Sequence, residues 1–271
     1  MSIRFEGVCK SFGPPENRKT VLQDVSFEVK TGEILFVLGK SGVGKSVTLK
    51  HIVGVLKPDS GHVFVDDTDV TRMNERRLAD IRRRCGMVFQ HPALLDSLSV
   101  YQNVSFGLRT PQYLRSLARP LDEREIRRVV IEKLRLVNLG SDVLERMPPE
   151  ISYGMQKRVS LARTLAPGPS YLLFDEPTTG LDPITTNAVN DLIYQLSREL
   201  RVTSVVVSHD MACALKIADR ILVLDQARIL ALGTPSEMKR SPEPLIRDFL
   251  AETLALLPPE ERDGERTENR T

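Results

Sequence analysis

The sequence has few cysteines, no long apolar run and almost no excess of charge. Its 3 cysteines, Cys9, Cys85 and Cys213, are scattered and form no CxxC pair, which suits a reducing compartment with buried thiols. No stretch approaches the roughly 20 apolar residues that span a bilayer, and residues 1–6 do not resemble the start of a signal peptide. If the protein serves a membrane, we therefore expect another chain to cross it.

The charges are nearly balanced, with 38 basic against 36 acidic residues and a formal net charge of +2. Such a small excess requires no polyanionic partner. Arginines do gather between residues 72 and 84, and they fit either a nucleic-acid-binding patch or the outer face of an amphipathic helix. The helix is favoured, because Leu78 and Ile81 recur at helical spacing and acidic residues lie between the arginines.

The rest of the chain is organised around residues 39–46, GKSGVGKS. They match the phosphate-loop pattern G-x-x-x-x-G-K-[ST], and they lie between the apolar run ILFVL and the helix-like VTLKHIVGVL. Glycines at such a turn can adopt positive φ and bring backbone N–H groups around the β- and γ-phosphates of a nucleotide, at the start of a helix. A glycine-rich turn with a chance lysine is the alternative, but every fixed position of the pattern is met.

Two side chains of this loop have a predicted role of their own. Lys45 places a point charge on the phosphates, and the Ser46 hydroxyl can ligate Mg²⁺. The sequence therefore predicts a site for a nucleoside triphosphate. The residues expected to surround the phosphates are Gly39, Lys40, Ser41, Gly42, Val43, Gly44, Lys45, Ser46 and Val47.

The remaining pattern predicts an α/β fold of the P-loop NTPase (RecA-like) class. Residues 3–12, 21–29 and 62–65 are strand-like and predict an antiparallel β edge, whereas residues 171–174, 205–207 and 221–224 are short apolar runs separated by helical patterns. Such runs indicate a mostly parallel sheet covered on both faces. We expect a nucleotide-binding core (1–90 and 167–256), an inserted α-helical subdomain (91–166) and a disordered tail (257–271).

Two acids follow the apolar run 171–174. At the carboxyl end of a parallel strand, Asp175 and Glu176 face the nucleotide crevice. Asp175 can hold Mg²⁺ through water, and Glu176 can orient and deprotonate an attacking water molecule. A plain turn would be an equal alternative for such a pair alone, but the phosphate loop in the same chain favours the catalytic interpretation.

In the order of these motifs, residues 3 to about 249 resemble the ATP-binding cassette (ABC) ATPases. Phe12, Gln90 and His209 are each weak signals alone, and their shared order with the phosphate loop and the acids carries the resemblance. The resemblance implies a fold, an ATPase activity and two ligands, ATP and Mg²⁺. Its implied residues are Glu176, His209 and Gln90 for catalysis, Ser46, Gln90 and Asp175 for the metal, Phe12 for adenine, and Ser152, Gly154 and Asp182 for the nucleotide of a neighbouring copy.

The resemblance also implies a homodimer that sandwiches two ATP molecules. Ser152 is well placed to cap the start of a helix, whose positive end would then face the γ-phosphate bound by the other copy. A head-to-tail arrangement with one site per chain closes by two-fold symmetry. Hydrolysis would remove the γ-phosphate contacts and loosen the pair.

The segment that corresponds to the family signature departs from its usual Leu-Ser-Gly-Gly-Gln. Here residues 151–155 read ISYGM, so that Tyr153 replaces the first glycine. If this position required positive φ, a tyrosine would strain it and slow the ATPase. The alternative, which we favour, is that Tyr153 adopts helical φ and points away from the phosphates.

Within the family, the sequence is most similar to Mla-type ATPases of MCE-associated systems, which move phospholipids or related apolar molecules between bacterial membranes. Residues 46–50 and 94–100 carry this similarity. It implies an integral-membrane permease as partner, an MCE-type substrate-binding protein in the same complex and a peripheral location on the cytoplasmic face of the inner membrane. A coupling helix of the permease would dock between Gln90 and the helical subdomain, in a groove that Leu94, Leu95 and Leu98 could line, although core packing is the alternative for at least one of them.

Other functions stay open at this point. The chain could serve an importer of amino acids or metal chelates, or a lipoprotein-releasing system. It could also be a non-transport cassette protein that acts on nucleic acid, ribosomes or cluster assembly. The sequence has no long heptad insertion, no second cassette and no basic excess, so we expect no nucleic-acid partner.

Overall fold

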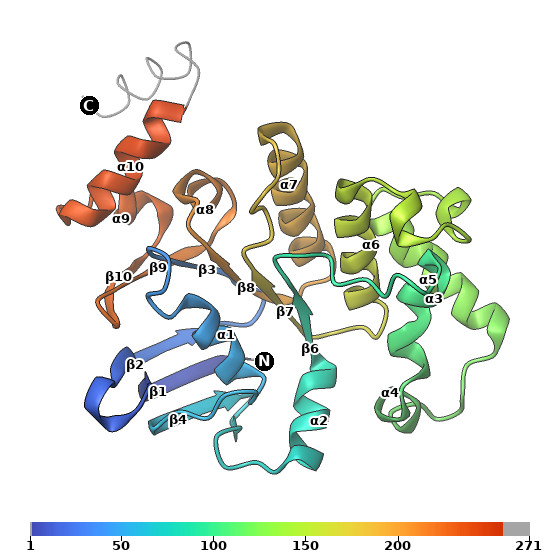
Figure 1. Ribbon diagram of the computed structural model, residues 1–271, viewed down its shortest axis with the longest axis horizontal. Coiled ribbons are helices and arrows are strands. Elements are labelled where there is room, and N and C mark those ends of the chain that lie inside the picture. Colours follow the sequence, from blue (N-terminus) through green and yellow to red (C-terminus); the bar gives the residue numbers. More distant parts are fainter. Residues whose placement is uncertain (1, 257–271) are drawn as a thin grey trace.

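The computed structural model describes residues 2–256 and contains two β-sheets with helices packed around them (Figure 1). The larger sheet has 6 strands in the order β10-β9-β3-β8-β7-β6. Their bounds are β3 Ile34–Leu38, β6 Cys85–Val88, β7 Tyr171–Asp175, β8 Thr203–Ser208, β9 Arg220–Asp225 and β10 Arg228–Gly233. Neighbouring strands from β9 to β6 pair in parallel, as the uninterrupted apolar runs predicted.

The predicted antiparallel strands form a sheet of their own rather than an edge of the larger sheet. This second sheet has the order β2-β1-β4-β5, with β1 Ile3–Phe12, β2 Lys19–Val29, β4 Ser60–Val65 and β5 Thr68–Asp69. The antiparallel edge of the larger sheet is β10, which pairs with β9 and was not predicted. β10 is a short edge strand that is only partly buried, and its apolar residues follow those of β9 after a two-residue turn.

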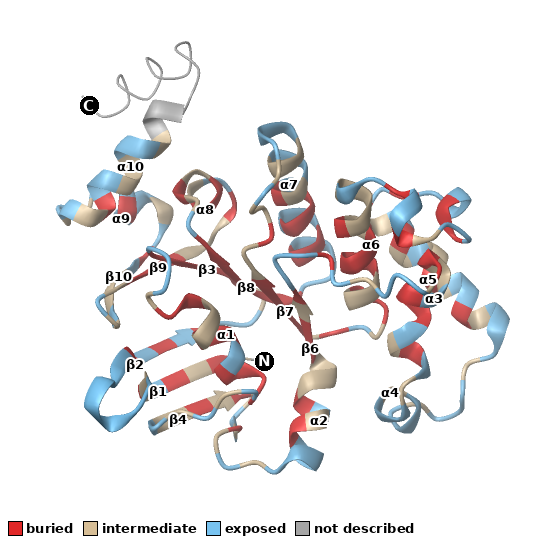
Figure 2. Cartoon of the chain, in the orientation of Figure 1, coloured by how far each residue is buried: buried red, intermediate tan, exposed pale blue. Residues whose placement is uncertain are grey.

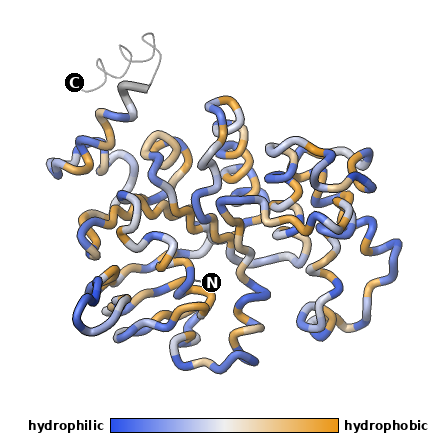
Figure 3. Tube along the Cα trace, in the orientation of Figure 1, coloured by the Kyte–Doolittle hydropathy of each residue, from blue (hydrophilic) through white to orange (hydrophobic). Residues whose placement is uncertain are grey.

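Both faces of the larger sheet are buried, and Figure 2 shows its strands as the most continuously buried part of the chain. On β3, Leu35 and Val37 join the core beneath the antiparallel sheet and α1 (Lys45–Ile52). Ile34 and Phe36 point to the opposite face and join the core beneath α7 (Pro183–Glu199) and α8 (Met211–Ile217). The hydrophobic colouring along these strands in Figure 3 reflects the same two-sided burial.

Residues 91–166, all of them described, contain helices and turns but no strand. The α-helices are α3 Val100–Ser105, α4 Pro111–Arg115, α5 Glu123–Leu136 and α6 Tyr153–Leu165, and the 3-10 turns are Phe106–Arg109, Ser141–Val143 and Pro148–Glu150. Reciprocal capping boxes begin α3, with Ser99 and Gln102, and α5, with Asp122 and Glu125. Exact subdomain boundaries at 90 and 167 stay a prediction.

The arginine-rich stretch forms helix α2 (Glu75–Arg84), in which Leu78 and Ile81 are buried, so the amphipathic interpretation is confirmed. After β10 come α9 (Pro235–Lys239) and α10 (Pro244–Leu256), which the sequence did not predict; a 3-10 turn at Pro15–Asn17 completes the elements. The tail predicted to be disordered, residues 257–271, lies outside the described residues.

Among residues 2–256, no helix is long and apolar enough to cross a membrane. The three cysteines carry free thiols: Cys85 and Cys213 are buried, and Cys9 is half-buried. Burial raises the pKa of Cys85 to about 12, so this thiol stays protonated and unreactive.

Candidate functional site

The phosphate loop joins β3 to α1 and takes the glycine conformations that its pattern predicted. Gly39, Gly42 and Gly44 have φ angles of 155°, 79° and 110°. A Cβ on Gly44 would lie 2.7 Å from the carbonyl oxygen of Val21, whereas a Cβ on Gly42 would meet nothing within 4 Å. Gly44 is therefore needed for close packing against β2, and Gly42 leaves open space above the loop.

Helix α1 begins at Lys45, so the last residues of this loop form its first turn, and no side chain caps its N-terminus. Its first N–H groups are therefore available to an anion, and the helix dipole favours one at this end. Lys45 is 6% exposed, and its ammonium donates hydrogen bonds to the carbonyl oxygens of Gly39 (2.8 Å) and Lys40 (3.1 Å). The loop thus gathers N–H groups and a cation around one small volume.

The two predicted acids at the end of β7 reach this volume. The Ser46 hydroxyl donates a hydrogen bond of 2.6 Å to Asp175, and the Lys45 ammonium lies 3.4 Å from a carboxylate oxygen of Glu176. Strands β3 and β7 lie on either side of β8 and run in the same direction, so both carboxyl ends open on the same edge of the sheet.

Glu176 has a φ angle of 51°, a left-handed conformation that is uncommon for a residue with a side chain. Its N–H donates to the carbonyl oxygen of Val207 at 2.9 Å, which fixes the backbone against β8. Its carboxylate accepts hydrogen bonds from Thr179 Oγ1 (2.9 Å) and pairs with His209 Nδ1 (2.7 Å). The strained backbone and these contacts hold the carboxylate towards the phosphate loop.

A cleft of about 780 Å³ lies over the loop, a size that fits a bound small molecule. It brings together most of the residues that the sequence predicted, from five parts of the chain. Phe12 lies at its margin with 40% of its surface exposed, so a planar ring can stack on it. The lining residues are Phe12, Val21, Lys40, Ser41, Gly42, Gly44, Lys45, Ser46, Val47, Gln90, Glu176, Thr179, His209, Phe249 and Glu252. We call it the phosphate-loop cleft.

The chain matches the model of the ABC transporter family over residues 22–179. The methionine import ATP-binding protein MetN of Carboxydothermus hydrogenoformans is 37% identical over 249 residues, which are 92% of this chain and 71% of that protein. The intermembrane phospholipid transport ATP-binding protein MlaF of Haemophilus influenzae is 37% identical over 233 residues, 86% of this chain and 85% of that protein.

A solved structure of an ATP-binding cassette is also similar to this chain. It is a dimeric, post-hydrolysis state of the ATP-binding cassette MJ0796 bound to ADP and Pi, with a TM-score of 0.77, 30% identity and coverage of 86% of this chain and 98% of that one. This chain belongs to the ABC transporter family. It is an ATPase subunit of a transport system, and the predicted family, fold class and enzyme activity are confirmed.

Six predicted residues of this ABC ATPase do not line its phosphate-loop cleft. Gly39, Val43 and Asp175 are sequence neighbours of lining residues, whereas Ser152, Gly154 and Asp182 are not. The latter three gather elsewhere, at the adjoining starts of α6 and α7. Ser152 caps α6 by accepting the N–H of Met155 at 3.3 Å, and Asp182 caps α7 by accepting the N–H of Thr185 at 3.0 Å. The Thr185 methyl lies 3.7 Å from the Cβ position of Gly154, which connects the two caps. We call this group the signature cluster.

The strain expected as one possibility at Tyr153 is absent. Tyr153 is the first residue of α6 and does not have positive φ, so the favoured alternative holds for its backbone. Its hydroxyl makes a hydrogen bond of 3.3 Å with His91 Nδ1, and its ring lies 5.7 Å from the Lys157 ammonium. The replacement of glycine is accommodated because the side chain leaves the helix start along the surface.

Four residues of the cleft were missed by sequence reasoning. Val21 and Thr179 adjoin predicted elements, and a hydroxyl three residues after Glu176 is a signal that could have found Thr179. Phe249 and Glu252 belong to α10, which the sequence did not predict, and the distance of about 200 residues from the phosphate loop left no local signal. The three leucines predicted for a docking groove differ: Leu95 is exposed, whereas Leu94 and Leu98 are half-buried and Leu94 packs on the core.

The residues around Ser46 fit a magnesium ion. Mg²⁺ prefers oxygen ligands and keeps water and phosphate oxygens in its shell. The Ser46 hydroxyl and the Asp175 carboxylate are already in contact, and Gln90 lines the same cleft. Within residues 2–256, no group of three or more His, Cys, Asp or Glu side chains could hold a metal without such additional ligands. The donor set therefore suits a metal that arrives with a nucleotide.

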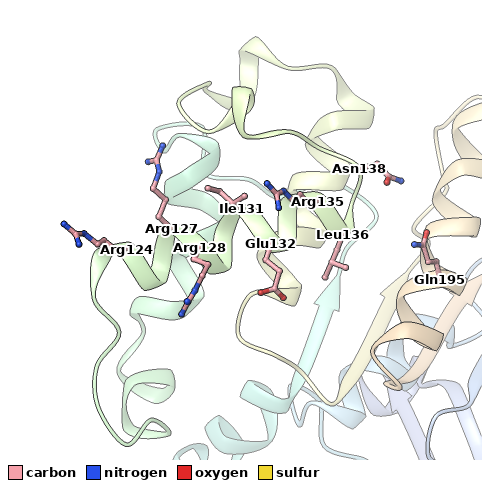
Figure 4. Close-up of a pocket in the computed structure, with 9 residues that line it drawn as sticks. All are labelled: Arg124, Arg127, Arg128, Ile131, Glu132, Arg135, Leu136, Asn138 and Gln195. Carbon is pink, nitrogen blue, oxygen red and sulfur yellow. The ribbon is translucent and has the colours of Figure 1, made fainter.

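A second hollow of about 740 Å³ lies far from the phosphate loop, along α5 (Figure 4). Arginines from one face of α5 line it, and Gln195 of α7 lies at its far side. Arg124, Arg127 and Arg128 point in different directions in Figure 4 rather than towards a common point. We call this hollow the α5 groove; it lacks the convergence that a small anion requires.

Proposed function

We propose that two copies of this ATPase sandwich two ATP molecules, each phosphate-loop cleft facing the signature cluster of the other copy. The observation that carries this proposal is the separation of the two groups within one chain: Ser152 and Asp182 do not line the cleft that holds Lys45 and Glu176. A head-to-tail pair with two-fold symmetry brings each cluster to the other's nucleotide. Ile184, beside Asp182, is 83% exposed, which suits burial against a second copy.

In this proposal, the chain's own groups divide the work of hydrolysis. Glu176, held by Thr179 and His209, orients a water molecule and accepts its proton. Lys45 and the N–H groups at the start of α1 bind the phosphates, and Phe12 stacks on adenine. Ser46, Asp175 and Gln90 would hold Mg²⁺, which neutralises phosphate charge when bound. The exposed start of α6 at Ser152 caps the γ-phosphate from the other copy.

The transported molecule is proposed to be a phospholipid or a related apolar molecule. Support comes from the similarity to MlaF, whose name assigns it to intermembrane phospholipid transport, and from residues 46–50 and 94–100. We further propose an integral-membrane permease and an MCE-type protein as partners, with the ATPase on the cytoplasmic face of the inner membrane. Exposed Leu95, next to the segment of Gln90, is where the permease would dock.

Amino-acid import is a second candidate. MetN, named for methionine import, is as identical to this chain as MlaF is, at 37%. Purification of the tagged chain from membranes of its native host separates the two. An MCE-type protein with co-purifying phospholipid supports lipid transport, whereas an amino-acid permease without an MCE-type protein contradicts it.

The sandwich can be tested on the full chain carrying Glu176→Gln, which keeps the ligands but lacks the base. Light scattering should give the mass of a dimer with Mg²⁺ and ATP and the mass of a monomer with ADP. A Ser152→Glu change in the same background places negative charge against the γ-phosphate and should abolish the dimer. If the chain stays monomeric with Mg²⁺, ATP and its membrane partner all present, the sandwich is wrong.

A further inference from the structure

Helix α6 contacts the backbone of residues 87–93, which we call the glutamine segment because it contains Gln90. Side chains of α6 donate hydrogen bonds to four carbonyl oxygens of this segment. The pairs are Thr164 with Met87 (3.4 Å), Lys157 with Gln90 (2.7 Å), and Arg163 with Pro92 (3.4 Å) and Ala93 (2.8 Å). Beyond the end of β6 at Val88 the segment is irregular, and its carbonyl groups need such partners; a single helix supplies them for Gln90, Pro92 and Ala93.

Lys157 differs from the other donors because it also contacts the turn after β7, which carries Glu176. Its ammonium lies 2.7 Å from the carbonyl oxygen of Gln90 and 2.7 Å from that of Pro177, the residue after Glu176. It therefore connects three segments: α6, the glutamine segment and the turn that carries the catalytic carboxylate. Lys157 itself is not among the residues that line the phosphate-loop cleft.

The position of Lys157 is unfavourable in free energy for a cation, because the side chain is buried. The side chain is 6% exposed, and burial lowers its pKa. Within residues 2–256 no carboxylate pairs with it; its hydrogen bonds go to the two backbone carbonyls. A buried ammonium loses hydration free energy, and an apolar side chain of similar length would avoid that loss. The two donated hydrogen bonds are what the ammonium provides and an apolar chain cannot.

Tyr153 covers the ammonium from the outer side. Its ring lies 5.7 Å from Lys157 Nζ, and its hydroxyl contacts His91, the residue after Gln90. A ring face at this distance attracts a cation. The tyrosine that departs from the family signature thus adds a second connection between the start of α6 and the glutamine segment.

We propose that Lys157 is a positioning residue for ATP hydrolysis. By binding the carbonyls of Gln90 and Pro177 together, it fixes the glutamine side chain and the Glu176 carboxylate relative to each other and to the helix that starts at Ser152. A displacement of the glutamine segment is therefore transmitted to α6 and to the catalytic turn at once. The proposal rests on the roles proposed above for Gln90 and Glu176, and not on the identity of the transported molecule.

The test compares Lys157→Met and Lys157→Gln in the full chain. Methionine fills the space but donates nothing, so ATP turnover should fall about tenfold or more, as expected when a group that orients a ligand is removed. The affinity for ATP should change less than twofold, because Lys157 does not line the cleft. The Mg²⁺ concentration for half-maximal activity should rise, because Gln90 loses its anchor. Glutamine still donates and should restore at least a third of the turnover.

Lys216→Met is the matched control, because it removes an exposed lysine that pairs with Asp191 on the surface of α8. Its turnover should match that of the unmodified chain. Turnover of Lys157→Met within twofold of the unmodified chain would overturn the proposal. Equal losses in the methionine and glutamine variants, together with lost ATP binding and a lower melting temperature, would also overturn it, since they indicate a structural role alone.

Glu176→Gln, measured in parallel, separates this inference from the function on which it rests. Normal turnover of Glu176→Gln would mean that the proposed catalytic role itself is wrong. Loss of turnover in Glu176→Gln with normal turnover in Lys157→Met would contradict the positioning role alone.

Discussion

The phosphate-loop cleft and the α5 groove have similar volumes, about 780 and 740 Å³, and both are lined by charged side chains. They differ in where those side chains come from. In the cleft, Lys45 and His209, from different parts of the chain, both contact the Glu176 carboxylate, at 3.4 and 2.7 Å. The α5 groove is lined almost entirely by one helix face, from which the arginines diverge (Figure 4).

Volume and charge alone therefore do not make a binding site. In the cleft, carbonyl oxygens of the phosphate loop hold Lys45, and Thr179 and His209 hold the Glu176 carboxylate, so that these side chains are positioned before a ligand arrives. On α5, exposed arginines of an amphipathic helix keep their side-chain freedom, and a ligand would have to order each of them at an entropic cost. Variants in the two places should therefore have very different effects.

The largest effect is expected for Glu176→Gln. The amide keeps the shape of the side chain but cannot accept a proton, so turnover should fall about 1,000-fold, while ATP binding stays within a few fold of the unmodified chain. Phosphate release and nucleotide binding, measured on the same preparation, check both parts. Rapid hydrolysis by this variant would show that another residue acts as the base.

Lys45→Ala should weaken ATP binding roughly 100-fold, because a charged donor to the phosphates is lost. Isothermal titration with ATP in the presence of Mg²⁺ measures this change. Lys40, in the same loop, lines the cleft but is exposed, so Lys40→Ala should have a much smaller effect. Normal affinity in Lys45→Ala would contradict the assignment of the phosphate loop.

Phe12→Ala should weaken ATP binding about tenfold, the usual loss when an aromatic ring that stacks on a base is removed. The matched control is Phe106→Ala in the helical segment, because that ring is also exposed, at 52% against 40%, and lies outside the cleft. A comparison of ATP with inorganic triphosphate identifies the cause. An equal loss for both ligands would show that Phe12 does not contact the base.

The smallest effect is expected in the α5 groove. Arg124→Ala combined with Arg128→Ala should leave ATP affinity and turnover within twofold, and it should change the free energy of unfolding by less than about 1 kcal/mol, since both side chains lie on the exposed face of α5. A tenfold loss of turnover would contradict this expectation, because it would show that the α5 groove contributes to catalysis.

Most strands of the larger sheet could be predicted, because fully buried strands are short and apolar throughout. The separate antiparallel sheet was not distinguished from an edge of the larger one, since alternation along β1 and β2 reports burial of one face but not the partner that covers it. The elements β10, α9 and α10 were missed although β10 and α10 contain apolar residues, because no motif in residues 228–256 showed what those residues pack against.

In the functional site, too, some residues could be predicted from the sequence and others could not. Local motifs identified Lys45, Ser46, Asp175 and Glu176, whose roles depend on a strand, a turn and a fixed spacing. No motif predicted that Phe249 and Glu252 line the cleft, or that Lys157 reaches Pro177. Those contacts join elements far apart in the chain, and they depend on how α10 and α6 pack.

By itself, the sequence determined that this chain binds and hydrolyses ATP in an ABC cassette, because the phosphate loop and the acids after β7 encode their geometry within a few residues. Only the tertiary structure decided that Ser152 and Asp182 gather away from the cleft of their own chain, and that one buried ammonium joins the glutamine segment to the catalytic turn. Distances between segments are set by the packing of helices on a twisted sheet, which no local pattern of residues specifies.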